Sequence, residues 1–192
     1  MIAIIKYNGG NVSSVQNALN RLGAESIITD DFELIKNADK VIFPGVGEAS
    51  STMKTLKEKG LDKLIPTLKQ PVLGICLGMQ LMCKNNEEGN TVGMGIFDIN
   101  VKKFPAENII PHMGWNTISD LKSTIYSGIK EESDVYFVHS FYCELSEDTS
   151  SICDYILPFS ASLQKDNFYA MQFHPEKSGK IGSQLLQNFL KL

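Results

Sequence analysis

The chain alternates between short, mostly apolar runs and longer stretches in which apolar residues recur every three or four positions. The short runs predict buried strands at residues 2–5, 26–29, 41–43 and 72–75. The longer stretches predict helices at about residues 11–22, 48–59, 61–68 and 77–84. Strands that alternate with helices are typical of a parallel sheet with helices on both faces.

The second half of the chain has a different pattern. Short strands separated by turns from residue 91 to residue 142 predict a small antiparallel extension. A further strand is expected at 168–173, and a closing helix at 178–190 that packs on the sheet. No repeat or linker divides the 192 residues. We therefore expect a single α/β domain over residues 1–192, with an open, mostly parallel sheet.

Cys76 stands between a predicted strand and a predicted helix. Gly74 and Gly78 lie two positions to either side and leave room for a strained backbone close to neighbouring chain. This arrangement is a nucleophile elbow, with Cys in place of the usual Ser. A thiol at the start of a helix faces the positive end of its dipole, which favours the thiolate. The alternative interpretation is a buried structural cysteine beside two packing glycines.

His174-Pro175-Glu176 follows the strand predicted at 168–173. In extended chain, residues two apart project to the same side, so the histidine and the glutamate are expected to lie near each other. A nucleophilic Cys needs a base within hydrogen-bond reach, and a third group usually orients that base. We therefore expect Cys76, His174 and Glu176 to be nucleophile, base and orienting carboxylate. Taken singly, a strand-end histidine and a solvated turn glutamate would be ordinary.

Two glycine clusters also follow predicted strands. The backbone amides of Pro44-Gly45-Val46-Gly47 suit an oxyanion, although the same residues suit a plain turn. In open α/β sheets the ligand crevice lies beyond the carboxyl ends of the strands, so residues 44–47, Cys76 and His174 are expected to meet at one edge. Asn8-Gly9-Gly10-Asn11 lacks the G-x-G-x-x-G spacing, so no nucleotide is expected there.

Composition excludes several classes of function. The net charge of −4 without a basic stripe argues against nucleic acid as a partner. The four cysteines show no CxxC spacing and the three histidines are spread along the chain, so no metal, cofactor or disulfide framework is expected. No stretch reaches membrane-spanning length, and the N-terminal apolar run is too short for a signal peptide. We expect no membrane association and a cytoplasmic, reducing location, which a catalytic thiol requires.

Residues 74–80, Gly-Ile-Cys-Leu-Gly-Met-Gln, together with His174-Pro175-Glu176, resemble the triad motifs of the class I glutamine amidotransferases. The likeness runs from the first strand to the last helix. The stretches at 44–47, 111–116 and 174–179 further resemble the glutaminase subunits of imidazole glycerol phosphate synthases within this class. Lys6 departs from that pattern, since many relatives carry Asp there. Because it lies away from the catalytic motifs, this departure concerns the subgroup or the partner rather than glutaminase chemistry.

The resemblance implies hydrolysis of glutamine to glutamate and ammonia through a thioester on Cys76. It implies an oxyanion hole formed by the N–H groups of Val46 and Leu77. It also implies glutamine binding by four residues: Gly47, Gln80, Ser140 and Phe141. Gln80 lies one helical turn past Cys76, near the thiol, although the residue pattern alone also suits an exposed helix position.

Free ammonia would be protonated and lost in bulk water. The resemblance implies that ammonia passes internally to a (β/α)8-barrel cyclase subunit, in a heterodimer that makes imidazole glycerol phosphate and aminoimidazole carboxamide ribotide in histidine biosynthesis. It implies partner contacts at Asn11, Trp115 and Lys177, although a core position for Trp115 remains open. One alternative is a paralogous subunit that supplies ammonia to another synthase. A non-catalytic binding subunit is the other, and an intact triad argues against it.

Overall fold

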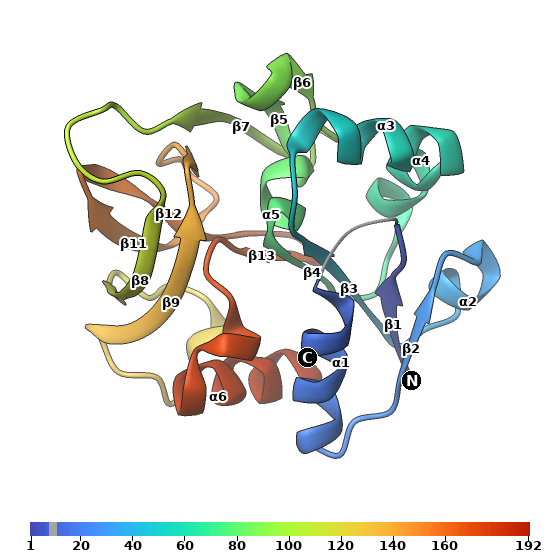
Figure 1. Ribbon diagram of the computed structural model, residues 1–192. Helices are drawn as coiled ribbons and strands as arrows, with labels where there is room; N and C mark the ends of the chain where they lie inside the picture. Colours follow the sequence, from blue (N-terminus) through green and yellow to red (C-terminus); the bar gives the residue numbers. More distant parts are fainter. Residues whose placement is uncertain (8–10) are drawn as a thin grey trace.

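The computed structural model describes residues 1–7 and 11–192, so the expectation of no nucleotide at residues 8–10 lies outside the described residues. A seven-stranded sheet forms the centre (Figure 1). Its strands are β1 (Ile2–Ile5), β2 (Ser26–Thr29), β3 (Lys40–Gly45), β4 (Val72–Cys76), β11 (Thr149–Tyr155), β12 (Leu157–Lys165) and β13 (Phe168–Met171). They lie in the order β11-β12-β13-β4-β3-β1-β2.

Five of these strands, β2, β1, β3, β4 and β13, are parallel, whereas β12 and β11 continue the sheet antiparallel. Because β3, β4 and β13 are parallel neighbours, their carboxyl ends lie side by side. The mostly parallel sheet is therefore confirmed. Cys76 is the last residue of β4, and the segments that follow β3 and β13 carry Gly47 and His174.

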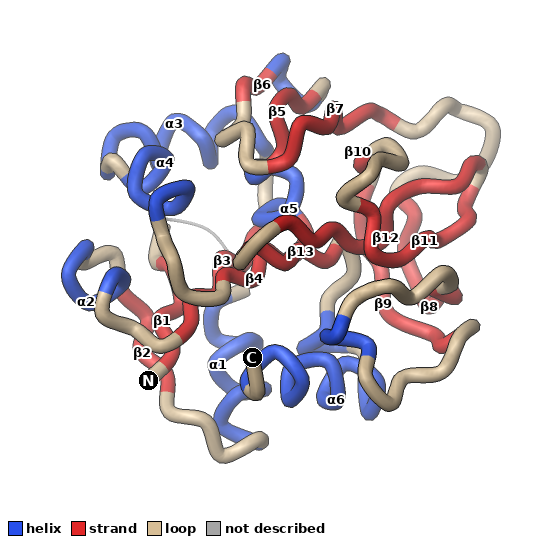
Figure 2. Tube along the Cα trace, turned by 180° about the vertical axis from the view of Figure 1, so that it is seen from behind, coloured by secondary structure: helices blue, strands red, loops and turns tan. Residues whose placement is uncertain are grey.

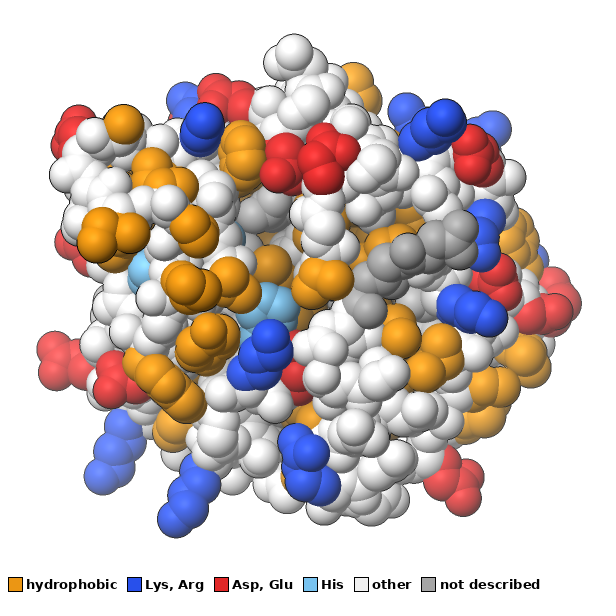
Figure 3. Space-filling view, in the orientation of Figure 1, with side chains coloured by type: hydrophobic (Ala, Val, Ile, Leu, Met, Phe, Trp, Pro, Cys, Tyr) orange, Lys and Arg blue, Asp and Glu red, His pale blue; other side chains and the backbone are white. Residues whose placement is uncertain are grey.

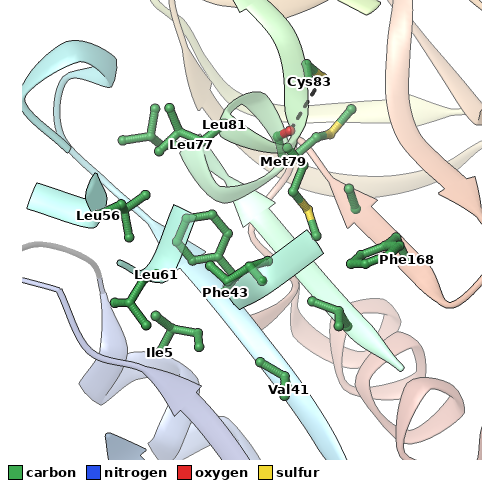
Figure 4. Close-up of a cluster of buried hydrophobic side chains, with 14 of the residues drawn as sticks. Ile5, Val41, Phe43, Leu56, Leu61, Leu77, Met79, Leu81, Cys83 and Phe168 are labelled. Carbon is green, nitrogen blue, oxygen red and sulfur yellow. Dashed lines mark hydrogen bonds between the residues drawn. The ribbon is translucent and has the colours of Figure 1, made fainter. Parts of the chain in front are cut away.

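Helices cover both faces of the sheet (Figure 2). They are α1 (Val12–Arg21), α2 (Phe32–Lys36), α3 (Ala49–Lys59), α4 (Leu61–Leu64), α5 (Leu77–Met82) and α6 (Gly179–Leu190). The helices α1 and α6 contribute to one buried cluster, and α3, α4 and α5 contribute to the other. Part of this second cluster, around Phe43, Leu56 and Leu77, is drawn in Figure 4.

Burial on both faces explains why β1 and β4 are continuous apolar runs in the sequence. In β1, Ala3 and Ile5 pack in one cluster, whereas Ile2 and Ile4 pack in the other. A strand covered on both faces has no solvent side and therefore no polar alternation. Full burial of each such aliphatic side chain contributes about 1.5–3 kcal/mol.

The remaining strands form two smaller sheets. One contains β5 (Cys83–Asn86), β6 (Thr91–Val92), β7 (Phe97–Lys103) and β10 (Phe141–Cys143), and the other pairs β8 (His112–Ile118) with β9 (Ser133–His139). The short strands predicted at residues 91–142 are present, but they lie in these smaller sheets, and β11 and β12 form the antiparallel extension of the main sheet. Sequence reasoning missed these two strands because buried serines such as Ser151 and Ser162 obscure their apolar pattern. Their hydroxyls are paired, to each other and to Tyr126.

Two helix predictions need correction, and one short helix was missed. The helix expected at 77–84 ends at Met82, because Cys83 enters β5 and pairs with Phe97 of β7. The helix expected at 61–68 stops at Leu64 and continues as a 3-10 turn over Ile65–Thr67, where Pro66 has no N–H to donate. The short α2 was not predicted; Asp31 caps it by accepting hydrogen bonds from the N–H groups of Glu33 and Leu34.

Candidate active site

Cys76 is the last residue of β4 and immediately precedes α5. Its backbone lies at φ 53° and ψ −112°, a conformation that non-glycine residues rarely adopt. The side chain is buried, with 8% exposed. Strained backbone of this kind persists only where the surrounding structure holds it, and it is concentrated at functional sites. The geometry is the elbow that the sequence predicted.

The packing around the elbow requires glycine at two positions. A Cβ on Gly78 would lie 2.0 Å from the Phe43 carbonyl oxygen, and one on Gly45 would lie 2.3 Å from the Gly78 amide nitrogen. Both contacts are with backbone and cannot be relieved by a side-chain movement. The start of α5 therefore lies directly against the end of β3, which places the loop after β3 beside Cys76.

His174 and Glu176 meet through a turn rather than along an extended strand. Residues Pro175–Lys177 form a 3-10 turn after His174. The Nδ1 atom of His174 lies 2.8 Å from Oε1 of Glu176, and both side chains are almost fully buried. Asn11 also donates to this oxygen, from Nδ2 at 3.2 Å. The expected proximity is confirmed, but the 3-10 turn produces it.

The electrostatics of His174 favour its charged form. Burial lowers the pKa of His174, but the Cys76 thiolate and the Glu176 carboxylate together overcome this effect and raise it from 6.5 to about 10. The second ring nitrogen, Nε2, has no hydrogen-bond partner within the described residues. The site therefore favours an imidazolium beside Cys76, with one imidazole nitrogen available for proton transfer to a substrate.

Gln172 contacts the thiol and was missed from the sequence. Its Nε2 lies 3.6 Å from Cys76 Sγ, and the side chain is fully buried. On the other side, Cys76 Sγ lies 3.9 Å from the Val138 carbonyl oxygen. The signal that could have revealed Gln172 is its position two residues before His174, since such residues project to the same side of extended chain.

A cleft of about 390 Å³ opens over the thiol. Cys76 and His174 lie in its walls. The walls also contain the two residues expected at the oxyanion hole, Val46 and Leu77, and the four expected to bind glutamine, which are Gly47, Gln80, Ser140 and Phe141. Four further wall residues were not predicted: Glu88, Pro111, Val138 and His139. Gln80 is buried rather than exposed, and its Nε2 donates to the Phe141 carbonyl at 3.0 Å.

The Tyr7 side chain holds the loop after β3. Its hydroxyl donates to the Pro44 carbonyl at 2.6 Å. Burial raises the pKa of Tyr7 above its usual range, the nearby Cys76 adds to this, and the backbone N–H of Val46 partly offsets it. The Val46 N–H therefore lies near the Tyr7 hydroxyl. Gly47 follows at φ 111°, where a side chain would be strained.

The residues expected at a partner interface lie in two settings. Trp115 is 58% exposed, which excludes the core position left open above, and its ring packs edge-on against Tyr136 at 6.0 Å between centroids. Lys177 is exposed, with Nζ 5.9 Å from the centre of the Tyr136 ring. In Figure 3, hydrophobic and basic side chains border the hollow in which histidine is visible. Asn11 instead contacts Glu176 of the triad.

Three further features concern metal binding, membrane association and the position of Lys6. Within residues 1–7 and 11–192, no group of three His, Cys, Asp or Glu side chains is placed to hold a metal ion. In the same residues, no helix is long and apolar enough to cross a membrane. Lys6 is exposed directly after β1.

Comparison with known proteins gives matches over the whole chain. A family model described as "Glutamine amidotransferase class-I" matches residues 3–192. The imidazole glycerol phosphate synthase subunit HisH of Bacteroides fragilis (strain YCH46) is 60% identical over 194 residues, which cover 100% of this chain and 99% of the relative. The protein of the same name from Haemophilus influenzae is 45% identical, with 99% and 96% covered.

Solved structures share the fold at low identity. A putative GMP synthase protein from Thermoplasma acidophilum superposes with a TM-score of 0.77 and 21% identity, covering 99% of this chain and 92% of that one. The structure of PurLQS from Thermotoga maritima matches with a TM-score of 0.75 and 15% identity, covering 99% and 97%. At this identity the likeness concerns the fold alone.

Proposed function

Because this chain belongs to the class I glutamine amidotransferase family, we propose that it is the glutaminase subunit of an imidazole glycerol phosphate synthase. It hydrolyses glutamine to glutamate and ammonia and passes the ammonia to a (β/α)8-barrel cyclase subunit in histidine biosynthesis. The observation that carries this proposal is the 60% identity over the full chain to a subunit of that name. The protein acts in the cytoplasm as one domain within a heterodimer, without metal or cofactor.

The triad carries out two half-reactions. The Cys76 thiolate attacks the carbon of the glutamine side-chain amide, and the tetrahedral intermediate collapses as the His174 imidazolium gives its proton to the departing nitrogen. Ammonia leaves and a glutamyl thioester remains on Cys76. The neutral His174 then takes a proton from water as the water attacks the thioester, and glutamate leaves with regeneration of thiolate and imidazolium. Glu176 orients the ring and stabilises its charged form.

The tetrahedral oxyanion needs donors that are in place before the reaction. The N–H of Leu77, at the start of α5, and the N–H of Val46 serve this role. Loss of one such donor costs about 2.7–4 kcal/mol. Since the Val46 N–H lies near the Tyr7 hydroxyl here, a rotation of the peptide next to Gly47 completes the hole. The cyclase partner favours this rotation by binding the completed state better.

Glutamine lies along the cleft wall formed by Gly47, Gln80, Ser140 and Phe141. Both hydrogens of the Gln80 amide are already used, one by the Phe141 carbonyl and one by Gln172 Oε1. Its Oε1 accepts from Asn86 and retains one lone pair. Gln80 therefore acts on glutamine as an acceptor, which suits the substrate ammonium group.

Copurification with the candidate cyclase and a glutaminase assay test this proposal. We expect a stable complex, a low kcat for the isolated protein, and a large rise in kcat when the cyclase carries its ligand. One donor rotated into place accounts for about 10²–10³-fold. If the isolated protein were already as fast as the liganded complex, that result would contradict the gated loop. Failure to bind the cyclase would instead favour the paralogous subunit of another synthase.

A further inference from the structure

A chain of hydrogen bonds outside the triad runs from β8 towards the thiol. It begins at Asn116, whose amide orientation is fixed because Oδ1 accepts from the Thr117 N–H at 2.8 Å. The two Nδ2 hydrogens are then directed to the Asp154 carbonyl and to Nε2 of His112, both at 3.1 Å. The Nε2 of His112 is therefore an acceptor and carries no proton.

The next two contacts fix the tautomers of both histidines. His112 Nδ1 lies 2.9 Å from Nε2 of His139, and His139 Nδ1 lies 2.8 Å from the Phe141 carbonyl oxygen. A carbonyl only accepts, so His139 Nδ1 carries a proton. When His139 is neutral, its Nε2 is an acceptor and His112 Nδ1 donates to it. One proton arrangement satisfies every contact, with both rings protonated on Nδ1.

Burial keeps both rings neutral at physiological pH. It lowers the pKa of His112 to about 4, and it lowers that of His139 to about 3 despite the hydrogen bond to Phe141. The aromatic rings of Phe104 and Phe137 pack against both histidines and supply no charge. The two neutral rings can therefore keep the same hydrogen-bond donors, with His112 donating to His139 and His139 donating to Phe141, rather than exchange protons with solvent.

The chain continues to the nucleophile. The Phe141 carbonyl also accepts from Gln80 Nε2, whose second hydrogen is donated to Gln172 Oε1 at 2.9 Å. Gln172 Nε2 in turn lies 3.6 Å from Cys76 Sγ. The carbonyl of Phe141 is thus the point at which the histidine pair meets the side chains that hold the thiol and line the glutamine cleft.

We propose that His112 and His139 are positioning residues, which hold the Phe141 carbonyl and, through Gln80 and Gln172, fix the glutamine cleft and the thiol. This role rests on the proposed glutaminase function. The pair also connects β8, which carries the exposed Trp115, with the catalytic cysteine. The hydrogen bonds of the two rings lead to Asn116, to each other and to Phe141, so the pair acts on the thiol through the cleft wall.

The proton arrangement can be measured on the unmodified protein. The chain has only three histidines, so 15N labelling of histidine gives three separable ring systems in NMR spectra. At pH 7 we expect His112 and His139 to be neutral, with the proton on Nδ1. Protonation of either ring on Nε2 would overturn the proposal. This readout requires no variant and no enzymatic activity.

A matched pair of variants tests the functional part in complex with the cyclase. His139→Leu removes the donor to Phe141, whereas His139→Asn places an amide nitrogen near the position of Nδ1. We expect His139→Leu to raise KM for glutamine at least tenfold, with a smaller change in kcat, and His139→Asn to stay within about threefold of wild type in KM. Equal KM values for both variants and wild type would overturn the positioning role.

A control separates positioning from general stability. The Tyr126 hydroxyl is hydrogen-bonded to the hydroxyls of Ser151 and Ser162 in another buried polar cluster, at 2.8 and 2.7 Å. Tyr126→Phe is expected to lower Tm and leave KM unchanged. If the wild-type complex does not hydrolyse glutamine, the proposed function fails, while the NMR measurement still decides the proton arrangement. If His139→Leu does not fold, KM of the Asn variant and the tautomers of the wild type carry the test.

Discussion

Replacing Glu176 with Gln removes one negative charge from the buried contact with His174 and keeps the shape of the side chain. Oε1 of Glu176 lies 2.8 Å from Nδ1 of the histidine, and both side chains are shielded from water. The change should therefore destabilise the imidazolium without displacing the ring. In the proposed mechanism the imidazolium gives its proton to the departing amide nitrogen, so kcat/KM is expected to fall at alkaline pH first.

The size of the effect follows from the pKa of His174, which is raised from 6.5 to about 10. One pKa unit corresponds to about 1.4 kcal/mol, so the charged ring is favoured by roughly 5 kcal/mol. Cys76 makes the larger favourable contribution and Glu176 the smaller one. Removing the Glu176 charge should cost roughly 2 kcal/mol, which lowers the His174 pKa by one to two units. The resulting loss in kcat/KM reaches about 30-fold only above pH 10, where little imidazolium remains in the variant.

The assay is the pH dependence of kcat/KM for the complex, which reports ionisations of the free enzyme. Wild type should lose activity as pH rises through about 10, and Glu176→Gln should lose it one to two units lower. Glu58→Gln removes an exposed carboxylate on α3 and serves as the control with an unchanged profile. An alkaline limb that stays in place in Glu176→Gln would refute this account of the His174 charge.

Three further outcomes are expected. His174→Asn should lower kcat more than Glu176→Gln, by about 10²–10⁴-fold, because His174 moves protons in both half-reactions; equal losses would mean that the roles are misassigned. Gly78→Ala should lower the free energy of unfolding by about 3 kcal/mol or more, because its Cβ would clash with the Phe43 carbonyl; calorimetry should show a fall of roughly 6–12 °C in Tm. In the control Gly128→Ala the new Cβ meets no atom within 4 Å, so the expected loss is about 1 kcal/mol. Since the pKa values of His112 and His139 are lowered in the folded state, their contribution to stability is complete above pH 6.5 and is lost as pH falls towards 4. Urea unfolding between those values should show a slope of about 1.4 kcal/mol per pH unit for each histidine, and His139→Asn should remove one of the two; an unchanged slope would contradict neutral burial of His139.

The sequence predicted that the segments at the carboxyl ends of β3, β4 and β13 lie close together, because the apolar runs and glycines that mark these strand ends are local features of the sequence. Apolar runs end at Gly45 and Cys76, and the glycines beside them permit the close backbone contact that a side chain would prevent. Parallel pairing of β3, β4 and β13 then brings the carboxyl ends together. The elbow and the strand-end histidine could therefore be assigned before any contact was known.

The residues that hold the triad in place could not be predicted in the same way. Gln172 contacts the thiol across 96 residues of sequence, and Asn11 contacts Glu176 across 165. The exposure of Trp115 depends on the pairing of β8 with β9 and not on its neighbours in the chain. Tertiary packing decides these positions, and the two-residue spacing between Gln172 and His174 is a local signal for Gln172 alone.

The most direct test of the central claim compares two nitrogen sources in the Cys76→Ala variant of the complex. Cys76 is the residue on the strained elbow and lines the cleft together with His174, and in the proposed function the cyclase takes only ammonia from this subunit. The account predicts that synthesis from glutamine is abolished while synthesis from added ammonium salt proceeds at the wild-type rate. Glutamine-dependent synthesis that survives in Cys76→Ala would contradict the assignment of the nucleophile.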